Sequence, residues 1–228
     1  MTQRSILSGT SPTVVIRAGR DIKVEGREGD RVETDAEGMW GLKVERKDGV
    51  IEVGSGRGHS DTWVRQHGDA IDVNAGKDCE VRVPFNSTVK IHSGRSAEIV
   101  GVRGSVPVAH VGRDLVIRGV ESVGGCAAGG SMEIEAQRVI GSELKFTTGR
   151  HLRCHIHELT NVKFMIKDMG GYWEMAFGEP ATQVWLKAGG DVTLVLDEKY
   201  ADYLPDVVGG LEIARPPQGD TPDEAPDR

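Results

Sequence analysis

Residues 189–196 read GGDVTLVL. Two glycines and an aspartate lead into Val192, Leu194 and Leu196, which are apolar residues at every second position. Alternation with a period of two places successive side chains on opposite faces of a β-strand, so that one face is buried and the other meets water. The stretch therefore predicts a glycine turn followed by a strand.

The same phrase recurs along the chain, with a small or apolar residue and a glycine ahead of an alternating run. Its copies begin at Gly76, Gly94, Gly112, Gly129, Gly149, Gly170 and Gly189. These glycines are 18, 18, 17, 20, 21 and 19 residues apart, and an eighth copy, AGRDIKV, stands apart at Gly19. A β-type repeat of about 20 residues is the signature of a solenoid, in which each repeat stacks on its neighbour.

A second apolar phrase follows in most repeats, for example Leu144 with Phe146 and Val184 with Leu186. Each repeat therefore carries about two strands, and stacking at about 4.8 Å buries a face that one repeat cannot bury alone. We expect an all-β, single-stranded β-solenoid (β-helix) with irregular coils of 17–21 residues. Its inward column should include Leu115, Ile134, Leu152 and Trp173, and its turn glycines should adopt positive φ.

The chain divides into three parts by composition. Residues 1–13 are predicted to be a flexible arm, and residues 209–228 a disordered, acidic, proline-rich tail. Between them, residues 14–208 form the solenoid domain. Within it, residues 14–74 are atypical N-terminal coils or cap, 75–197 are regular coils, and 198–208 are a C-terminal cap with one helical turn.

Composition excludes several classes of function. The net charge of −7 argues against nucleic acid as a partner. No run approaches 18 apolar residues, so no membrane span is expected. The first 13 residues do not read as a secretion signal, which predicts a cytoplasmic protein. The three cysteines do not predict a disulfide framework: Cys79 and Cys154 take inward positions, and Cys126 lies in a Gly-Ala turn.

Residues 81–120 resemble a widespread bacterial β-solenoid family labelled "putative adhesin". The opening V-x-V-P-x-x-x-x-V of that family falls on Val81, Val83, Pro84 and Val89, and glycine-led coils follow it. Residues 18–33 are similar to the N-terminal strand pair of the family. The resemblance implies a right-handed β-solenoid without known catalytic residues. A weaker resemblance is to bactofilins, which are cytosolic β-solenoids that polymerise without nucleotide.

The densest group of possible metal ligands is His151, Cys154, His155 and His157. On a strand, His155 and His157 share a face that His151 could join, while Cys154 points the other way. Zinc takes about four ligands around one point. We therefore predict exposed strand histidines and no metal site.

Two further groups of residues have ordinary structural explanations. The segment GSGRG at residues 54–58 could cradle a phosphate, but no helix pattern follows it, so a flexible turn is predicted. Asp21, Asp78, Asp114 and Asp191 recur after the turn glycines and could form a calcium ladder. Other residues interrupt that column, which favours aspartates that hydrogen-bond turn backbone.

Contact residues are the sharpest functional prediction. The inward positions of Phe164 and Val184 leave Met165 and Trp185 facing outward, one coil apart. Val116 and Val195 also break the polar pattern of the outer face. An exposed apolar strip indicates a protein contact, and the alternative is that a loop or the tail of the chain folds over it.

The sequence as a whole predicts a non-catalytic scaffold or self-assembling structural protein that acts through protein–protein contacts. Its partner would be another protein or further copies in a homo-oligomer or filament, with no cofactor. An adhesin-like surface or ligand-binding module is the alternative. A polysaccharide-acting β-helix enzyme is a remote one, since no pair of acids is singled out.

Overall fold

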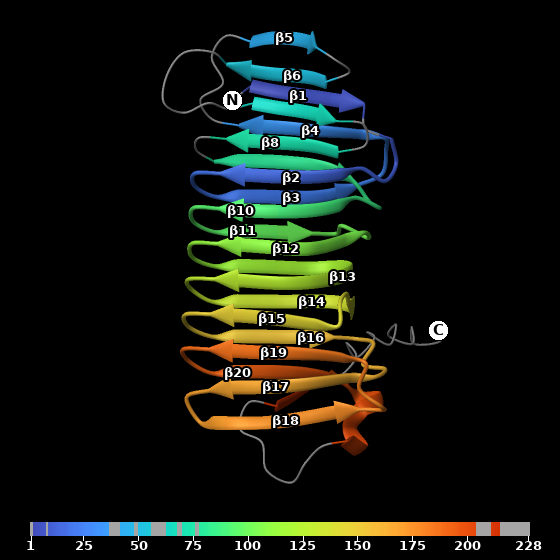
Figure 1. The fold of residues 1–228 in the computed structure, drawn as a ribbon, viewed down its shortest axis with the longest axis vertical. Coiled ribbons are helices and arrows are strands. Elements are labelled where there is room, and N and C mark those ends of the chain that lie inside the picture. The colour runs from blue at the N-terminus through green and yellow to red at the C-terminus, as the bar shows by residue number, and fades with distance from the viewer. Residues whose placement is uncertain are drawn as a thin grey trace, which may run out of the picture.

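The computed structural model describes residues 2–7, 9–36, 42–47, 50–55, 63–67, 70–75, 78–203 and 211–214. These residues lie almost entirely in β-strands, with one short 3-10 helix, η1 (Glu198–Tyr203). The strands stack across the long axis of an elongated molecule (Figure 1). The prediction of an all-β chain is confirmed. Within the same residues, no helix is long and apolar enough to cross a bilayer.

The strands form two hydrogen-bonded ladders. Ladder I runs in spatial order through β5 (Leu42–Lys47), β6 (Val50–Ser55), β7 (Trp63–His67), β8 (Ala70–Ala75), β2 (Thr13–Ala18), β10 (Thr88–Ser93), β12 (Ser105–Val111), the last part of β13 (Leu115–Ala128), β15 (Glu143–Thr148), β19 (Thr182–Ala188), β17 (Val162–Asp168) and β18 (Gly171–Phe177). Pairing is parallel from β8 to β17 and antiparallel at both ends.

Ladder II has the same parallel middle. In spatial order it comprises β1 (Thr2–Leu7), β4 (Arg31–Ala36), β9 (Cys79–Pro84), β3 (Ile22–Arg27), β11 (Ala97–Val100), the first part of β13, β14 (Met132–Val139), β16 (Leu152–Ile156), β20 (Val192–Asp197) and β21 (Leu211–Ala214). The pairs β1–β4 and β4–β9 are antiparallel, and the remaining pairs are parallel. From β10 to β16 the chain alternates between the two ladders.

The order of strands in space differs from their order in the chain. β2 lies between β8 and β10, and β3 lies between β9 and β11. The N-terminal part of the domain is therefore not wholly a cap, because its first two strands belong to the regular stack. The atypical parts are the antiparallel run of β5 to β8, which continues ladder I beyond β2, and β4, which is antiparallel to both of its neighbours in ladder II.

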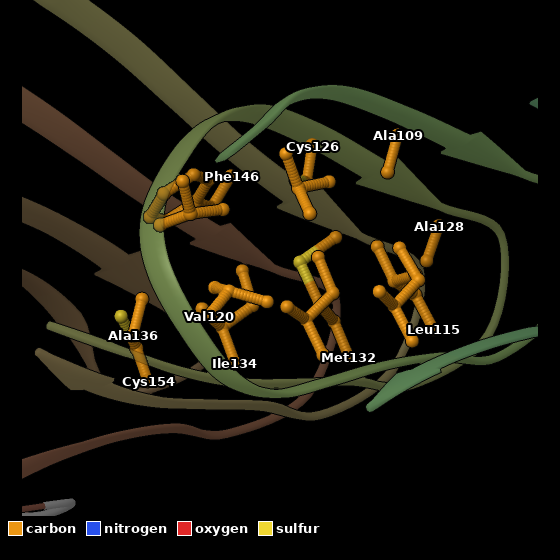
Figure 2. Packing of buried hydrophobic residues seen from close by; sticks show 14 of the residues in the cluster. Ala109, Leu115, Val120, Cys126, Ala128, Met132, Ile134, Ala136, Phe146 and Cys154 are labelled. Atoms are coloured by element: carbon orange, nitrogen blue, oxygen red, sulfur yellow. The ribbon is translucent and has the colours of Figure 1, made fainter. Parts of the chain in front are cut away.

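The core lies between the two ladders. Figure 2 shows Cys126, Ala128 and Phe146 on one wall pointing toward Leu115 and Met132 on the other. Parallel pairing keeps like positions above one another, so that Leu115, Met132, Leu152 and Val192 are in register. Burial of this continuous column is the main stabilising contribution to the fold.

The predicted inward positions of Leu115, Ile134 and Leu152 in one ladder are correct, and that of Trp173 is wrong. Leu115 and Leu152 share one register position, and Ile134 occupies the next inward position of the same ladder, opposite Cys154. Trp173 instead pairs with Ile166 in an antiparallel hairpin of ladder I and packs against the margin of the core. The copy at Gly170 is therefore the second strand of a hairpin and not a coil.

The turn glycines lie one above another in a column. Their backbones approach so closely that there is no room for a side chain at these positions. A Cβ atom built on Gly94, Gly112, Gly129, Gly149 or Gly189 would lie 2.3–2.4 Å from the carbonyl oxygen of the glycine in the adjacent coil. Gly19 lies beside Gly94, and Gly149 lies beside Gly189. The expected positive φ is wrong for these glycines, since the positive φ values occur at others, such as Gly119.

Both termini are more ordered than the sequence predicts. The expected N-terminal arm contains β1, which pairs with β4, and the expected tail begins with β21, which extends ladder II beyond β20. Residues 215–228 lie outside the described residues. The helical turn is present as η1, where the Tyr200 ring packs on Phe177. Cys126 is buried inside β13, and so its predicted place in a turn is wrong.

Candidate functional site

The predicted contact residues Met165 and Trp185 lie side by side. They are in register on the neighbouring strands β17 and β19. Trp185 is 37% exposed, whereas Met165 is only 5% exposed although it lies outside the core cluster. The prediction of an exposed pair is therefore correct for Trp185 and wrong for Met165.

Val116 and Val195 do not extend this pair into one strip. Both belong to ladder II, where Val116 is half-buried and Val195 is buried. Val116 is in register with Glu133 and, through it, with Arg153, so β14 and β16 separate it from β20. The polar outer residues of two strands lie between the valines, and the expected continuous apolar strip is absent at these four positions.

In the described part of the chain, three large apolar side chains are exposed near the end of ladder I, and two others, Val100 and Ile140, lie elsewhere. Met169, in the turn between β17 and β18, is 78% exposed, and Tyr172 on β18 is 53% exposed. Trp185 lies two strands away on β19. Within the described residues, β18 pairs with β17 alone, so its other edge meets no strand of this part of the chain. We call this edge, with Met169, Tyr172 and Trp185, the end surface.

A charged network lies across the end surface. The Lys163 ammonium and the Tyr172 hydroxyl both donate hydrogen bonds to the Glu174 carboxylate. The bond from Lys163, together with that from Tyr172, lowers the pKa of Glu174 below its ordinary value. The same carboxylate raises the pKa of Tyr172. The edge therefore carries an ion pair of Lys163 with Glu174 beside the exposed Tyr172 ring.

A second cluster lies at the same end of the molecule, on the outer face of ladder II. His155 Nε2 is 2.8 Å from Asp197 Oδ1, and His157 Nδ1 is 3.1 Å from Oδ1 and 3.2 Å from Oδ2. The two imidazole rings are 4.1 Å apart, centroid to centroid. The cluster arises because β16 and β20 are parallel neighbours, and their outward residues at the carboxyl ends of the strands meet.

The electrostatics of this cluster favour an ionised carboxylate. Burial alone would raise the pKa of Asp197, but hydrogen bonds and charge from His155 and His157 outweigh it and lower the pKa. Glu135 Oε1 lies 3.7 Å from His157 Nε2, and Lys199 Nζ lies 3.6 Å from Asp197 Oδ2. His155, His157 and Asp197 are each half-buried, so water reaches the cluster.

The other residues of the predicted histidine group are not part of this cluster. His151 is exposed, and its Nδ1 lies 3.4 Å from Asp191 Oδ2. The Cys154 side chain is buried in the core, and burial raises the pKa of its thiol. Sequence reasoning found His155 and His157 on one face but missed Asp197, which is 40 residues beyond His157. Only the pairing of β16 with β20 would have indicated it.

Asp21, Asp78 and Asp114 accept hydrogen bonds from backbone N–H groups, as expected. The donors lie in neighbouring turns of the stack and not in the same turn. The Ser131 N–H donates to Asp114 Oδ1 at 2.7 Å, and the Ser96 N–H donates to Asp21 Oδ1 at 3.0 Å. The Asp21 N–H donates in the same way to Asp78. These carboxylates therefore join neighbouring coils. The glycine-rich segment at residues 54–58 lies only partly within the described residues, and its predicted turn lies outside them from residue 56 onward.

A shallow groove follows the glycine column along the molecule. It has a volume of about 880 Å³, and the glycines with small residues such as Ala128 form its floor. His92, His110, Thr147 and Lys187 also line it. The groove exists because the glycine column leaves the turns of successive coils without side chains. Its shape suits an extended ligand.

Comparisons with known proteins add little to this picture. No family model matches the chain, and neither does any curated protein. One similar solved structure is a crystal structure from Clostridium sporogenes described as a putative cell adhesion protein. It shares 10% sequence identity and a TM-score of 0.38, over 86% of this chain and 98% of that one. The description agrees only weakly with the adhesin resemblance, and at this similarity it carries no argument. The resemblances to the adhesin family and to bactofilins stay predictions.

Proposed function

We propose that the chain winds as a right-handed β-solenoid and works as a non-catalytic structural protein that joins to other protein chains, including copies of itself. The winding is supported by the alternation of successive strands between ladder I and ladder II. From β10 to β16, each return to the same ladder adds one strand beside the previous one. Such a rod has ends, and its ends are where joining takes place.

The end surface is the observation that carries this proposal. A strand paired on one side presents N–H and C=O groups that a strand of another chain can meet. Here Tyr172 lies on the edge strand, Met169 lies in the turn before it, and Trp185 lies two strands away on the same surface. Apolar side chains are the usual centre of protein contacts. Backbone pairing would provide the alignment of the two chains, and the apolar side chains would provide affinity.

Light scattering of the full chain over a range of concentrations tests the proposal. Wild-type protein should form assemblies that grow with concentration. Lysines at two exposed β18 positions, Tyr172→Lys with Ala176→Lys, should return it to a monomer, because lysine on an edge strand opposes pairing. Gln183→Lys with Thr147→Lys is the matched control, since the two changes add the same charge at exposed positions of β19 and β15, strands paired on both sides.

Trp185→Glu probes the apolar part of the same surface. It should weaken or abolish association without unfolding the protein, since the Trp185 side chain is outside the core cluster. Unchanged particle size in this variant would remove Trp185 from the contact. Wild-type protein that stays monomeric at all concentrations would contradict self-association altogether.

The groove along the glycine column favours a second candidate function, ligand binding of the adhesin kind. Its length and its lining by imidazole and ammonium groups suit an extended polar ligand. Thr147→Trp would fill the groove from an exposed position. A ligand found by glycan or peptide array should lose its binding to this variant, and retained binding would place the ligand elsewhere.

A further inference from the structure

We infer that His155, His157 and Asp197 bind one divalent transition-metal ion, of which zinc is the best match. The inference is independent of the proposed function, because the cluster lies on ladder II and the end surface lies on ladder I. It starts from the ligand atoms: one from each residue, all within 4.8 Å of one another.

The spacing of these atoms is close to that of a metal site. Ligands about 2.0–2.1 Å from a tetrahedral zinc ion are about 3.3 Å from one another. The carboxylate oxygen Oδ1 lies 2.8 Å from His155 Nε2 and 3.1 Å from His157 Nδ1. An ion can therefore enter with shifts of a few tenths of an ångström along these two edges. Asp197 then exchanges its hydrogen bonds for a coordinate bond.

The surroundings also resemble those of a metal site. Coordination through His157 Nδ1 leaves the Nε2–H directed to the side on which Glu135 Oε1 lies, 3.7 Å away. A carboxylate behind a ligating histidine fixes the ring and raises its basicity. The backbone of His157 is held as well, because its carbonyl accepts from the Tyr200 hydroxyl at 3.3 Å. Two strands and η1 thus preorganise the ligands.

The donor set selects the ion. Two imidazole nitrogens and a carboxylate oxygen suit zinc and its first-row neighbours better than calcium or magnesium, which prefer all-oxygen sites. Lys199 lies near Asp197 and would oppose a cation there. The Lys199 side chain is 56% exposed, so its ammonium can turn toward water when the ion binds.

The bound ion would join β16 to β20 and leave its fourth position open. The three side chains are 17%, 25% and 24% exposed, which leaves access for water or for a side chain of a partner. An ion that binds only the folded state stabilises it. Zinc should therefore raise the melting temperature of the whole protein.

Titration of tag-free, chelator-treated protein with Co²⁺ and Zn²⁺ tests the inference. We expect one equivalent of Co²⁺ per chain, with the visible absorption of a four-coordinate ion, and displacement by Zn²⁺. His155→Gln and Asp197→Asn should each weaken affinity by more than about 100-fold, and Glu135→Gln by about 10-fold. Each of these variants should also lose part or all of the zinc-dependent rise in melting temperature.

His151→Gln is the matched control, because His151 and Asp191 form a histidine–aspartate pair on the opposite ends of the same two strands. This variant should bind like wild type. Circular dichroism checks that each variant folds. Wild-type protein that binds no stoichiometric metal overturns the inference, whatever the variants do. So does a folded Asp197→Asn protein with wild-type affinity.

Discussion

At the scale of single residues, the glycine column explains why one phrase recurs. The sequence indicates a glycine at each turn, and the usual reason for such a glycine is a backbone that needs positive φ. The structure gives a different reason, namely that adjacent turns lie too close for a Cβ atom. The contact is with backbone, which cannot rotate away, so each of the five turns that carry this contact needs a glycine.

Gly129→Ala should lower the free energy of unfolding by about 3 kcal/mol, because its Cβ would lie 2.3 Å from the carbonyl oxygen of Gly112. Gly125→Ala, four residues earlier, places its Cβ at an ordinary 3.6 Å from the Lys145 carbonyl oxygen. That change should stay within about 1 kcal/mol of wild type. Urea denaturation measures both, and equal losses would refute the steric explanation.

At the scale of elements, the sequence predicts strands better than it predicts their neighbours. Alternation is a local property, and it correctly places Leu115, Leu152 and Leu194 inside. Which strand lies beside which is not local, because glycine-led phrases are nearly interchangeable. The hairpin of β17 and β18, which departs from the repeat, does give a signal in the sequence. β17 ends at Asp168 and β18 begins at Gly171, and a two-residue connection is typical of a hairpin.

In the candidate sites too, the sequence predicts what a single strand determines and misses what the pairing of two strands determines. Alternation places His155 and His157 on one face, but Asp197 becomes their neighbour only because β20 pairs with β16 and β17–β18 lies elsewhere. The exposure of Trp185 follows from its strand, whereas the burial of Met165 and Val195 outside the core depends on tertiary packing. Residues that depend on one strand are predictable, and sites built by two strands are not.

The strand β10 should make stability sensitive to acid. His92 lies on it between Arg17 of β2 and His110 of β12, with its ring centroid 5.4 Å from that of His110. Burial, followed by the charges of His110 and Arg17, lowers the pKa of His92 below its ordinary 6.5. The unfolded chain therefore takes up this proton first, and stability falls as the pH drops through 6.5 toward the lowered value.

The test compares urea unfolding of wild-type protein and His92→Gln from pH 8 to pH 5, a range about the ordinary histidine pKa. The variant should lose part of the acid sensitivity because glutamine does not titrate. Added salt should reduce the difference, since the neighbouring charges are partly exposed. Identical pH profiles for the two proteins would exclude His92 as the source.

At the scale of the whole molecule, one core runs through both ladders and encloses all three cysteines. Cys79, Cys126 and Cys154 are buried thiols that form no disulfide with one another. Burial raises the pKa of Cys126 to about 12 and also raises that of Cys154. A buried thiol that stays protonated is inert, because the thiolate is the reactive form.

The native protein should therefore give almost no rapid reaction with a thiol reagent, and urea should release three thiols per chain. The slow native rate should follow the opening of the core and rise in destabilised variants such as Gly129→Ala. A thiol that reacts at once in native protein would mean that a cysteine lies outside the continuous core.

The position of β19 between β15 and β17 has a consequence for synthesis on the ribosome. The strand β17 emerges first and can pair in parallel with a neighbour, yet the edge of β15 belongs in the finished protein to β19. That edge must stay vacant until residues 182–188 have been made. The closure of β17 on β18 covers one edge of β17 before β19 is made, and this pair persists in the finished protein. A chain stalled before residue 182 would be the one most prone to join the wrong edge.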